Sequence, residues 1–310
     1  MTLNDHSAFD LLGDPAAEEV TVVTFHDERL TTNGWLYHGT LVVEVNAWSE
    51  FAEFTRRTRQ ETDCLKPVHF KALTGTQKES SRTRLGIRWA RALDRDLLSV
   101  ARFFLLGVDL RKIDHSRFGD ATTKPRQRKT MIYNRFFEIG LFTALRWFFS
   151  NQPAIHVHRI VVEQRDLPAD DPFPRYAPRR IQWRESNITF CHDELLALAA
   201  KTVPEDARMA PALDALQITD VLVGGFSMVL DATTSRTGCS RVADALLPRI
   251  RKMNDKPYNA RSCCWKKVAM RFFPKDAWRD QIKVGGVGMG QMFDSRLLAY
   301  EGAGQMDLFV

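Results

Sequence analysis

The chain has 310 residues, of which 44% are hydrophobic and 26% charged, and its five cysteines form no C-x-x-C pair. This composition is that of a globular protein and excludes a disordered chain or a disulfide-stabilised secreted domain. No apolar run reaches the roughly 18 residues of a membrane span; residues 139–149 come nearest and contain Arg146. The N-terminus lacks the basic start and apolar core of a secretion signal. We therefore expect a cytoplasmic protein.

Lys and Arg together exceed Asp and Glu by 44 to 38, which gives a net charge of +6. A basic balance is compatible with nucleic-acid binding but does not establish it. Two basic clusters supply the candidate nucleic-acid-binding residues, which are Lys124, Arg126, Arg128 and Lys129 in the first and Arg175, Arg179 and Arg180 in the second. The alternative for each cluster is an ordinary solvated surface.

Apolar periodicity predicts the elements in chain order. A β-branched strand at 21–26 and a second strand at 35–45 are joined by the polar turn TTNG as a hairpin. Further strands are predicted at 101–108, 156–165 and 188–191, and helices at 48–59, 76–98, 131–149, 211–230 and 241–253. The segments 114–129 and 167–180 are interpreted as polar connections, 285–290 as a flexible glycine-rich connector, and the chain beyond 253 as less regular.

Three strands followed by alternating helices and strands favour an α/β fold with a mixed β-sheet flanked by helices. We expect an N-terminal segment (1–19), a main domain (20–235) with a helical insertion at about 46–98, a basic C-terminal extension (236–300) and a flexible tail (301–310).

Four acidic residues that are far apart in the chain are embedded in apolar segments: Asp27, Glu138, Glu163 and Asp220. A carboxylate in such a setting is costly unless it is paired or binds a metal ion. Two-metal phosphodiester cleavage requires several carboxylates that converge on Mg²⁺ or Mn²⁺, and these hard cations prefer oxygen ligands. The alternative for each residue is a solvent-facing or salt-bridged carboxylate, and a helix can turn Glu138 outward.

Several short motifs carry a resemblance to a known family. Residues 25–29 (FHDER) resemble the Asp-Glu-Ser strand that opens the domain-of-unknown-function 3800 family, and 162–165 (VEQR) are similar to its Ile-Asp-Glu-Arg strand. Residues 188–193 (ITFCHD) are similar to its Phe-Val-Asp-Ser strand, and 216–220 (LQITD) to its Leu-Gln-hydrophobic-Ala-Asp helix. Lys71 falls where the family often has a lysine. The resemblance spans about residues 20 to 230.

This resemblance implies an RNase H-like fold and a nuclease that depends on Mg²⁺ or Mn²⁺. It implies that Asp27, Glu163 and Asp220 are metal ligands and that Lys71 contacts the phosphate or the nucleophile. The chain order of the acids, with Glu138 on a helix, also resembles that of RNase H-like enzymes. Here Arg29 replaces the family's Ser and Glu163 its Asp. The further candidate ligands are Glu28, Asp166 and Asp193.

The C-terminal residues resemble the peptide with which bacterial replication and repair proteins bind the sliding clamp. The candidate partner-binding residues are Gln305, Met306, Asp307, Leu308 and Phe309. Leu308 and Phe309 would be apolar anchors in a groove, and Gln305 would hydrogen-bond at its rim. The alternative is that this end folds back onto the body.

These features favour a metal-dependent nuclease, with DNA favoured over RNA and recruitment by the clamp. The alternative is a non-catalytic, clamp-associated nucleic-acid-binding adaptor on the same scaffold. The chain has no G-x-x-x-x-G-K-[ST] loop and no nucleophile elbow, which disfavours P-loop ATPases and serine hydrolases. Phage defence and mobile-element maintenance are both compatible with this interpretation.

Overall fold

A computed structural model describes residues 19–73, 80–94, 96–164, 173–199, 207–231, 237–254, 266–274, 283–284 and 287–288. At its centre is a seven-stranded sheet with the order β5-β4-β1-β2-β3-β7, in which β6 also pairs with β4. Its strands are β1 (Val20–Leu30), β2 (Trp35–Glu44), β3 (Ala101–Asp109), β4 (Ile155–Glu163), β5 (Ile188–Phe190), β6 (Leu196–Leu198) and β7 (Val268–Phe273).

The sheet is mixed because β2 runs opposite to the other strands. It is antiparallel to β1 and β3, whereas β4 is parallel to β1, and β5, β6 and β7 are parallel to their neighbours. The predicted α/β fold, a mixed sheet flanked by helices, is confirmed. One consequence matters for function: the carboxyl ends of β1, β3 and β4 all lie at the same edge of the sheet.

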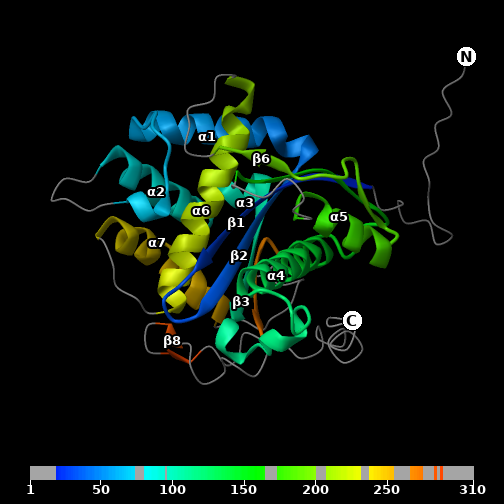
Figure 1. Cartoon of the computed structure of the whole chain (residues 1–310). Coiled ribbons are helices and arrows are strands. Elements are labelled where there is room, and N and C mark those ends of the chain that lie inside the picture. Colours follow the sequence, from blue (N-terminus) through cyan, green and yellow to red (C-terminus); the bar gives the residue numbers. More distant parts are fainter. Residues whose placement is uncertain are drawn as a thin grey trace, which may run out of the picture.

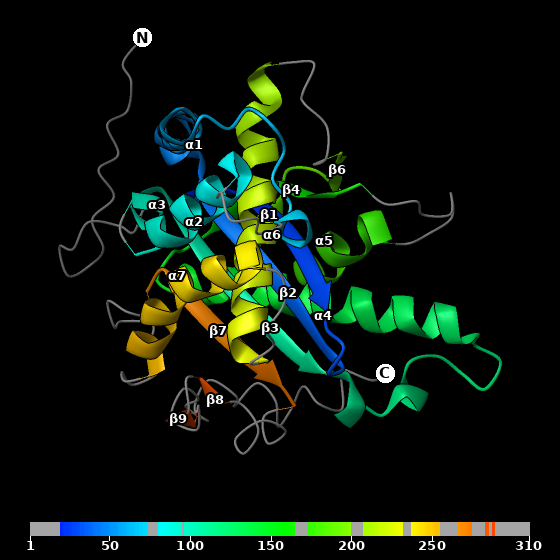
Figure 2. The same ribbon diagram turned by 90° about the vertical axis from the view of Figure 1, so that its left-hand side faces the viewer.

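Helices cover both faces of the sheet (Figures 1 and 2). The helices are α1 (Trp48–Thr62), α2 (Ser81–Ala92), α3 (Asp96–Val100), α4 (Pro125–Phe148), α5 (Phe173–Arg184), α6 (Ala210–Leu230) and α7 (Thr237–Asn254). On β2, a Cβ at Gly39 would meet Val223 of α6, whereas His38 lies against Gly140 of α4. Because successive strand residues face opposite sides, α6 and α4 lie on opposite faces. The helices α1, α2 and α7 pack around α6, and α5 packs on α4.

The short connections are 3₁₀ helices: η1 (Val45–Ala47), η2 (Phe70–Ala72), η3 (Leu110–Lys112), η4 (His115–Arg117) and η5 (Ala207–Met209). The two-residue strands β8 (Lys283–Val284) and β9 (Val287–Gly288) pair with each other. Of the predicted glycine-rich connector (285–290), the structure describes only residues 287–288, which form β9. The N-terminal segment before residue 19 and the tail at 301–310 lie outside the described residues.

Helix α6 is the central element of its layer. Among the described helices it alone is long and apolar enough to cross a membrane, which the sequence-based search for apolar runs missed, but 89% of that segment is buried inside the fold. Its apolar surface is satisfied by β1, β2, α2 and α7, so it is the core helix of the domain.

Four sequence-based assignments are corrected. Residues 173–180, predicted as a connection, belong to α5, because Phe173, Ala177 and Ile181 recur at helical spacing and are buried. Residues 125–129 form the first turns of α4, and 76–98 contains two helices rather than one. The C-terminal extension supplies α7 and the edge strand β7, so it is integral to the domain.

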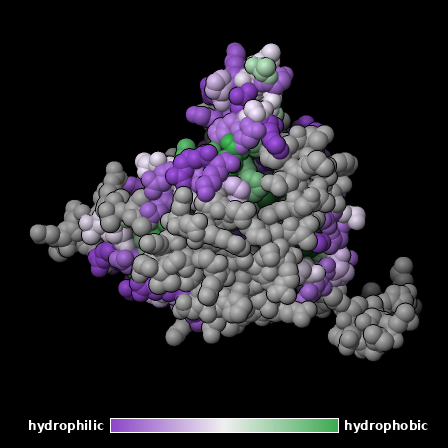
Figure 3. Space-filling view, turned by 90° about the horizontal axis from the view of Figure 1, so that it is seen from below, coloured by the Kyte–Doolittle hydropathy of each residue, from purple (hydrophilic) through white to green (hydrophobic). Residues whose placement is uncertain are grey.

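The described surface is mainly hydrophilic in the view from below (Figure 3). Among the described residues, the large hydrophobic side chains that are exposed are scattered: Leu30, Val45, Leu65 and Met131. Isolated apolar side chains of this kind are normal on a protein surface. This part of the chain therefore presents charged and polar groups rather than an extended apolar face.

Because α6 approaches the sheet closely, we predict that position 39 does not tolerate a side chain. A Cβ at Gly39 would lie 2.0 Å from Cγ2 of Val223, so Gly39→Ala should force α6 outward and lower the free energy of unfolding by about 1–3 kcal/mol. Gly140→Ala is the matched control, because its Cβ would lie 3.7 Å from its nearest neighbours and a helix favours Ala over Gly. Denaturant unfolding of the two variants checks this; equal stabilities would contradict the tight α6 contact.

Candidate active site

Asp27 and Glu163 lie side by side at the carboxyl ends of β1 and β4. The parallel register pairs His26 with Val162, so the next residue along each strand is one of the two acids. Two residues earlier on each strand, Phe25 and Val161 are part of the core beneath α6. Because side chains alternate along a strand, Asp27 and Glu163 share that face.

Asp220 approaches the same place from α6, which packs on β1. Its Oδ2 accepts a hydrogen bond of 2.8 Å from the backbone N–H of Phe70 and lies 3.3 Å from Nδ1 of His69. The charge of Asp220 is the strongest of the neighbouring charges that act on Asp27. The fold therefore brings together three of the four acids that the sequence singled out.

The environment of Asp27 is strongly unfavourable for a negative charge on its carboxyl group. Burial raises the pKa of its carboxyl well above the usual range, and the nearby charges of Asp220, Glu28 and Glu163 raise it further. One hydrogen bond of 2.8 Å, from the N–H of Glu28 to Oδ1, acts in the opposite direction. A cation between these carboxylates would remove the repulsion and hold Asp27 ionised.

The segment that carries His69 is docked along α6 by specific contacts. Oε1 of Gln217 accepts a 2.8 Å hydrogen bond from the N–H of Val68, one turn before the contact between Asp220 and Phe70. A Cβ at Gly224 would lie 2.2 Å from the Phe70 ring, so glycine is required for this approach. These contacts bring His69 to Asp220.

His69 is a candidate functional residue that the sequence analysis missed. Its Nδ1 faces Asp220, and its Nε2 is buried with no hydrogen-bond partner in the described part of the chain. Its proximity in sequence to Lys71 was the available signal, since no periodicity marks it. Lys71 itself is exposed on η2, next to the Phe70 N–H that donates to Asp220.

Glu28 projects to the opposite face of the sheet from Asp27. Its Oε2 accepts a 3.1 Å hydrogen bond from the Tyr133 hydroxyl of α4. That hydroxyl lies 3.3 Å from Nε2 of the buried His26, which in turn lies 3.3 Å from Nδ1 of the buried His38. Glu28 thus adds charge near Asp27, but its carboxylate belongs to a polar cluster beneath α4.

Glu138 does not join the acids, so its sequence-based assignment to the site is corrected. It lies on α4, on the face of the sheet opposite to Asp220. Its carboxylate is buried in ion pairs of 2.9 Å to Arg135 and 3.1 Å to Arg180. Two guanidinium groups compensate its charge, and this explains an acid in an apolar helix without a metal ion.

The remaining predicted ligands are not gathered into the cluster. Asp193 is exposed in the connection between β5 and β6, and it is not among the charges that act on Asp27. Asp166 lies outside the described residues, as do the five residues predicted to bind the clamp.

The basic candidates divide into two groups. Lys124, Arg126, Lys129 and Arg179 are exposed, and the first three stand at the beginning of α4. By contrast, Arg128 donates to the backbone oxygens of Phe118 and Asp120, Arg175 pairs with Glu194, and Arg180 pairs with Glu138. The three engaged side chains stabilise local structure, which weakens their assignment to nucleic-acid binding.

The donor chemistry at the site fits a hard divalent cation in part. Carboxylates from β1, β4 and α6 provide the oxygen ligands that Mg²⁺ and Mn²⁺ prefer. However, within the described residues no group of three or more His, Cys, Asp or Glu side chains is arranged to hold a metal ion. Oδ2 of Asp220 is engaged by Phe70 and His69, so a cation would share this carboxylate with both groups.

Comparisons with known proteins add little to this geometry. No model of a known family matches the chain, and no curated protein matches it. A solved structure of the PCNA:RNase HII complex from Archaeoglobus fulgidus is 8% identical, with a TM-score of 0.29, and the match covers 75% of this chain and 89% of that chain. A similarity this slight carries no inference about activity.

The raised pKa of Asp27 predicts a pH-dependent stability in the presence of EDTA. Between the ordinary Asp pKa of about 3.9 and the raised value, the native state binds more protons than the unfolded state, so the free energy of unfolding falls as the pH rises. Asp27→Asn removes this titration. The variant should therefore gain stability over the wild type as the pH rises from 4 to 8, which urea unfolding measures. A constant difference across this range would contradict the repulsive cluster.

The ion pairs of Glu138 predict a structural role. Glu138→Gln would leave the buried Arg135 without its counter-charge and should lower the free energy of unfolding by about 3–5 kcal/mol. The control is Glu53→Gln, which removes an exposed partner of Arg56 and should have no measurable effect. A Glu138 variant of native stability would return this residue to the list of candidate functional groups.

Proposed function

We propose that this protein is a divalent-metal-dependent nuclease that cleaves phosphodiester bonds, with DNA favoured over RNA. The observation that carries the proposal is the gathering of Asp27, Glu163 and Asp220 on one face of the sheet, with mutual repulsion that raises the pKa of the buried Asp27. A buried acid that served only stability would have cationic partners, as Glu138 has, whereas the charges that act on Asp27 are those of other carboxylates.

The residues have distinct roles in this proposal. Asp27, buried at the end of β1, would be the central ligand, and Glu163 and Asp220 would complete the set from β4 and α6. Mg²⁺ or Mn²⁺ would supply charge stabilisation at the phosphate and lower the pKa of the attacking water. Lys71 is exposed beside the site and would contact the phosphate. His69, with Nδ1 3.3 Å from Asp220, would orient that carboxylate.

A non-catalytic nucleic-acid-binding adaptor is the second candidate. The observation that favours it is the engagement of the Asp220 carboxylate by Phe70 and His69, without an arranged group of three ligands in the described ranges. An adaptor would bind nucleic acid without cleaving it under any metal condition. The two candidates therefore differ in one measurement, metal-dependent strand cleavage.

The experiment is a cleavage assay on single- and double-stranded DNA and RNA with Mg²⁺, Mn²⁺ or EDTA. We expect cleavage with metal, and a loss of at least about a hundredfold in Asp27→Asn, Glu163→Gln and Asp220→Asn, because each removes charge that holds the cations. Asp193→Asn is the matched control: it neutralises an acid on the exposed β5 side and should retain activity. Circular dichroism establishes that each variant is folded.

The outcomes separate the two candidates. Absence of cleavage by the wild type on every substrate overturns the nuclease and leaves the adaptor. Full activity in Asp27→Asn removes that residue from the mechanism. His69→Ala should lower kcat and shift its pH profile; a change in KM alone would assign His69 to substrate binding.

Clamp recruitment is a separate part of the proposal. It rests on the resemblance of residues 305–309 to a clamp-binding peptide. Deletion of residues 305–310 should abolish binding to a bacterial sliding clamp and leave cleavage of short DNA unchanged. Clamp binding that persists in the truncated protein would contradict the assignment.

A further inference from the structure

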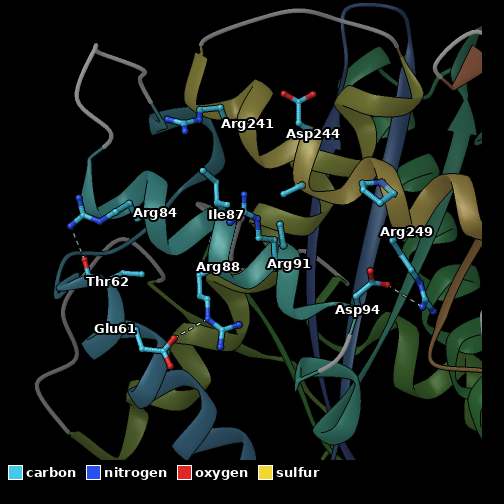
Figure 4. A pocket seen from close by; sticks show the side chains of 13 residues that line it. Glu61, Thr62, Arg84, Ile87, Arg88, Arg91, Asp94, Arg241, Asp244 and Arg249 are labelled. Atoms are coloured by element: carbon cyan, nitrogen blue, oxygen red, sulfur yellow. Dashed lines mark hydrogen bonds and ion pairs between the residues drawn. The ribbon is translucent and has the colours of Figure 1, made fainter.

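A second charged feature lies away from the acids, in a groove between α2 and α7 that the end of α1 closes (Figure 4). The hollow has a volume of about 1000 Å³. We call it the α2–α7 groove. Its charged lining residues are Arg84, Arg88, Arg91, Arg241 and Arg249 together with Glu61, Asp94 and Asp244. None of the residues of the candidate active site lines it.

The charge of the groove is positive, with five arginines against three acids. Two of the acids are compensated within the wall: Glu61 lies 2.8 Å from Nε of Arg88, and Asp94 lies 3.5 Å from Nη1 of Arg249 (Figure 4). Asp244 is exposed on α7. Arg88 also pairs at 2.9 Å with Asp96, which lies outside the lining, so the five arginines face four acids. The remaining positive charge favours an anionic ligand.

The arginines of α2 form a straight row. Arg84, Arg88 and Arg91 are spaced at i, i+4 and i+7, so they lie along one side of the helix. The row spans roughly 10 Å along the helix axis, which is about three nucleotide steps of one strand. Nη2 of Arg84 donates to the backbone oxygen of Thr62 at 3.0 Å, and Arg91 is exposed. The first arginine of the row is thus anchored to the end of α1, and the last is exposed to solvent.

We propose that the α2–α7 groove binds the sugar–phosphate backbone of nucleic acid. Guanidinium groups match phosphates by bidentate hydrogen bonding. The uncharged lining residues are Thr62, Ile87, Ala90, Ala245 and Pro248, and none can stack on a base. The contact proposed here is therefore one to phosphates and not one of aromatic stacking on bases. The biological use of this site rests on the proposed nuclease function, for which it holds the substrate.

The experiment measures the binding of a short fluorescent DNA duplex by anisotropy in EDTA, where no cleavage interferes. Arg84→Ala combined with Arg91→Ala should weaken binding at least about tenfold and lower the slope of log K against log salt by about 2, because each phosphate contact contributes about 1. Asp244→Asn should act in the opposite direction and tighten binding, since it removes a negative charge from the same wall.

The matched control is Arg56→Ala combined with Arg117→Ala, which changes the net charge equally. Both of these arginines are exposed, pair with a neighbouring acid and lie outside the groove. We expect the control to bind DNA almost as the wild type does. Equal losses in the two double variants would show a general charge effect and overturn the proposal.

Competition with inorganic phosphate distinguishes a nucleic-acid site from a simple anion site. At equal phosphate concentration, DNA of unrelated sequence should compete much better than free phosphate, because adjacent arginines engage linked phosphates. Equal competition would overturn the proposal.

The outcome is separable from that of the nuclease proposal. Asp27→Asn should bind DNA normally in EDTA, whereas the groove variant should raise the KM for DNA cleavage more than it lowers kcat. If the wild type cleaves nothing, the groove still stands on the binding data alone. If the groove variant binds as the wild type does while Asp27→Asn loses cleavage, only the groove inference fails.

Discussion

The close contact of α6 with the β1–β2 hairpin determines where the acidic side chains meet. At Gly39 the absence of a side chain lets Val223 of α6 reach the strand, and at Gly224 the same helix admits the ring of Phe70. Gly39 is paired directly with Asp27 in the sheet. The helix that carries Asp220 is thereby held over the strand that carries Asp27, and a bulkier residue at either glycine would separate them.

The alternation of side chains along β1 gives the two faces of the sheet different chemistry. Asp27 faces α6 together with Glu163 and Asp220, where negative charge accumulates beside His69. Its neighbours His26 and Glu28 face α4 and form a hydrogen-bonded cluster with Tyr133 and His38. The two faces differ in how charge is compensated. Beneath α4 the polar groups form hydrogen bonds with one another, whereas beneath α6 the carboxylates repel. Repulsion of this kind is a common property of sites that bind cations.

Compensation of charge also separates the acids that resemble each other in sequence. Glu138 and Asp220 each interrupt an apolar helix, and their local patterns are similar. Two arginines neutralise Glu138. Asp220 has instead a backbone N–H and a histidine, whose charge depends on protonation. The first arrangement stabilises a fold, and the second leaves an acid available for function.

The order of the elements and the fold class could be predicted from periodicity, because strand and helix patterns are local properties of the chain. The prediction was wrong where local composition misled, as in the arginine- and proline-rich segment that forms α5 around three buried apolar residues. Asp27, Glu163 and Asp220 were identified because a carboxylate within an apolar segment is costly wherever it occurs.

By itself, the sequence determined which residues are acidic, which segments are apolar and therefore which α/β architecture forms. Only the tertiary structure decided which acids meet. Packing between segments that are distant in the chain decides on which face of a strand or helix a side chain lies. It also decides which groups the side chain contacts there. For that reason the sequence could not show that Glu138 lies outside the candidate site or that His69 lies within it. It also could not show that arginines of α2 and α7 line one groove.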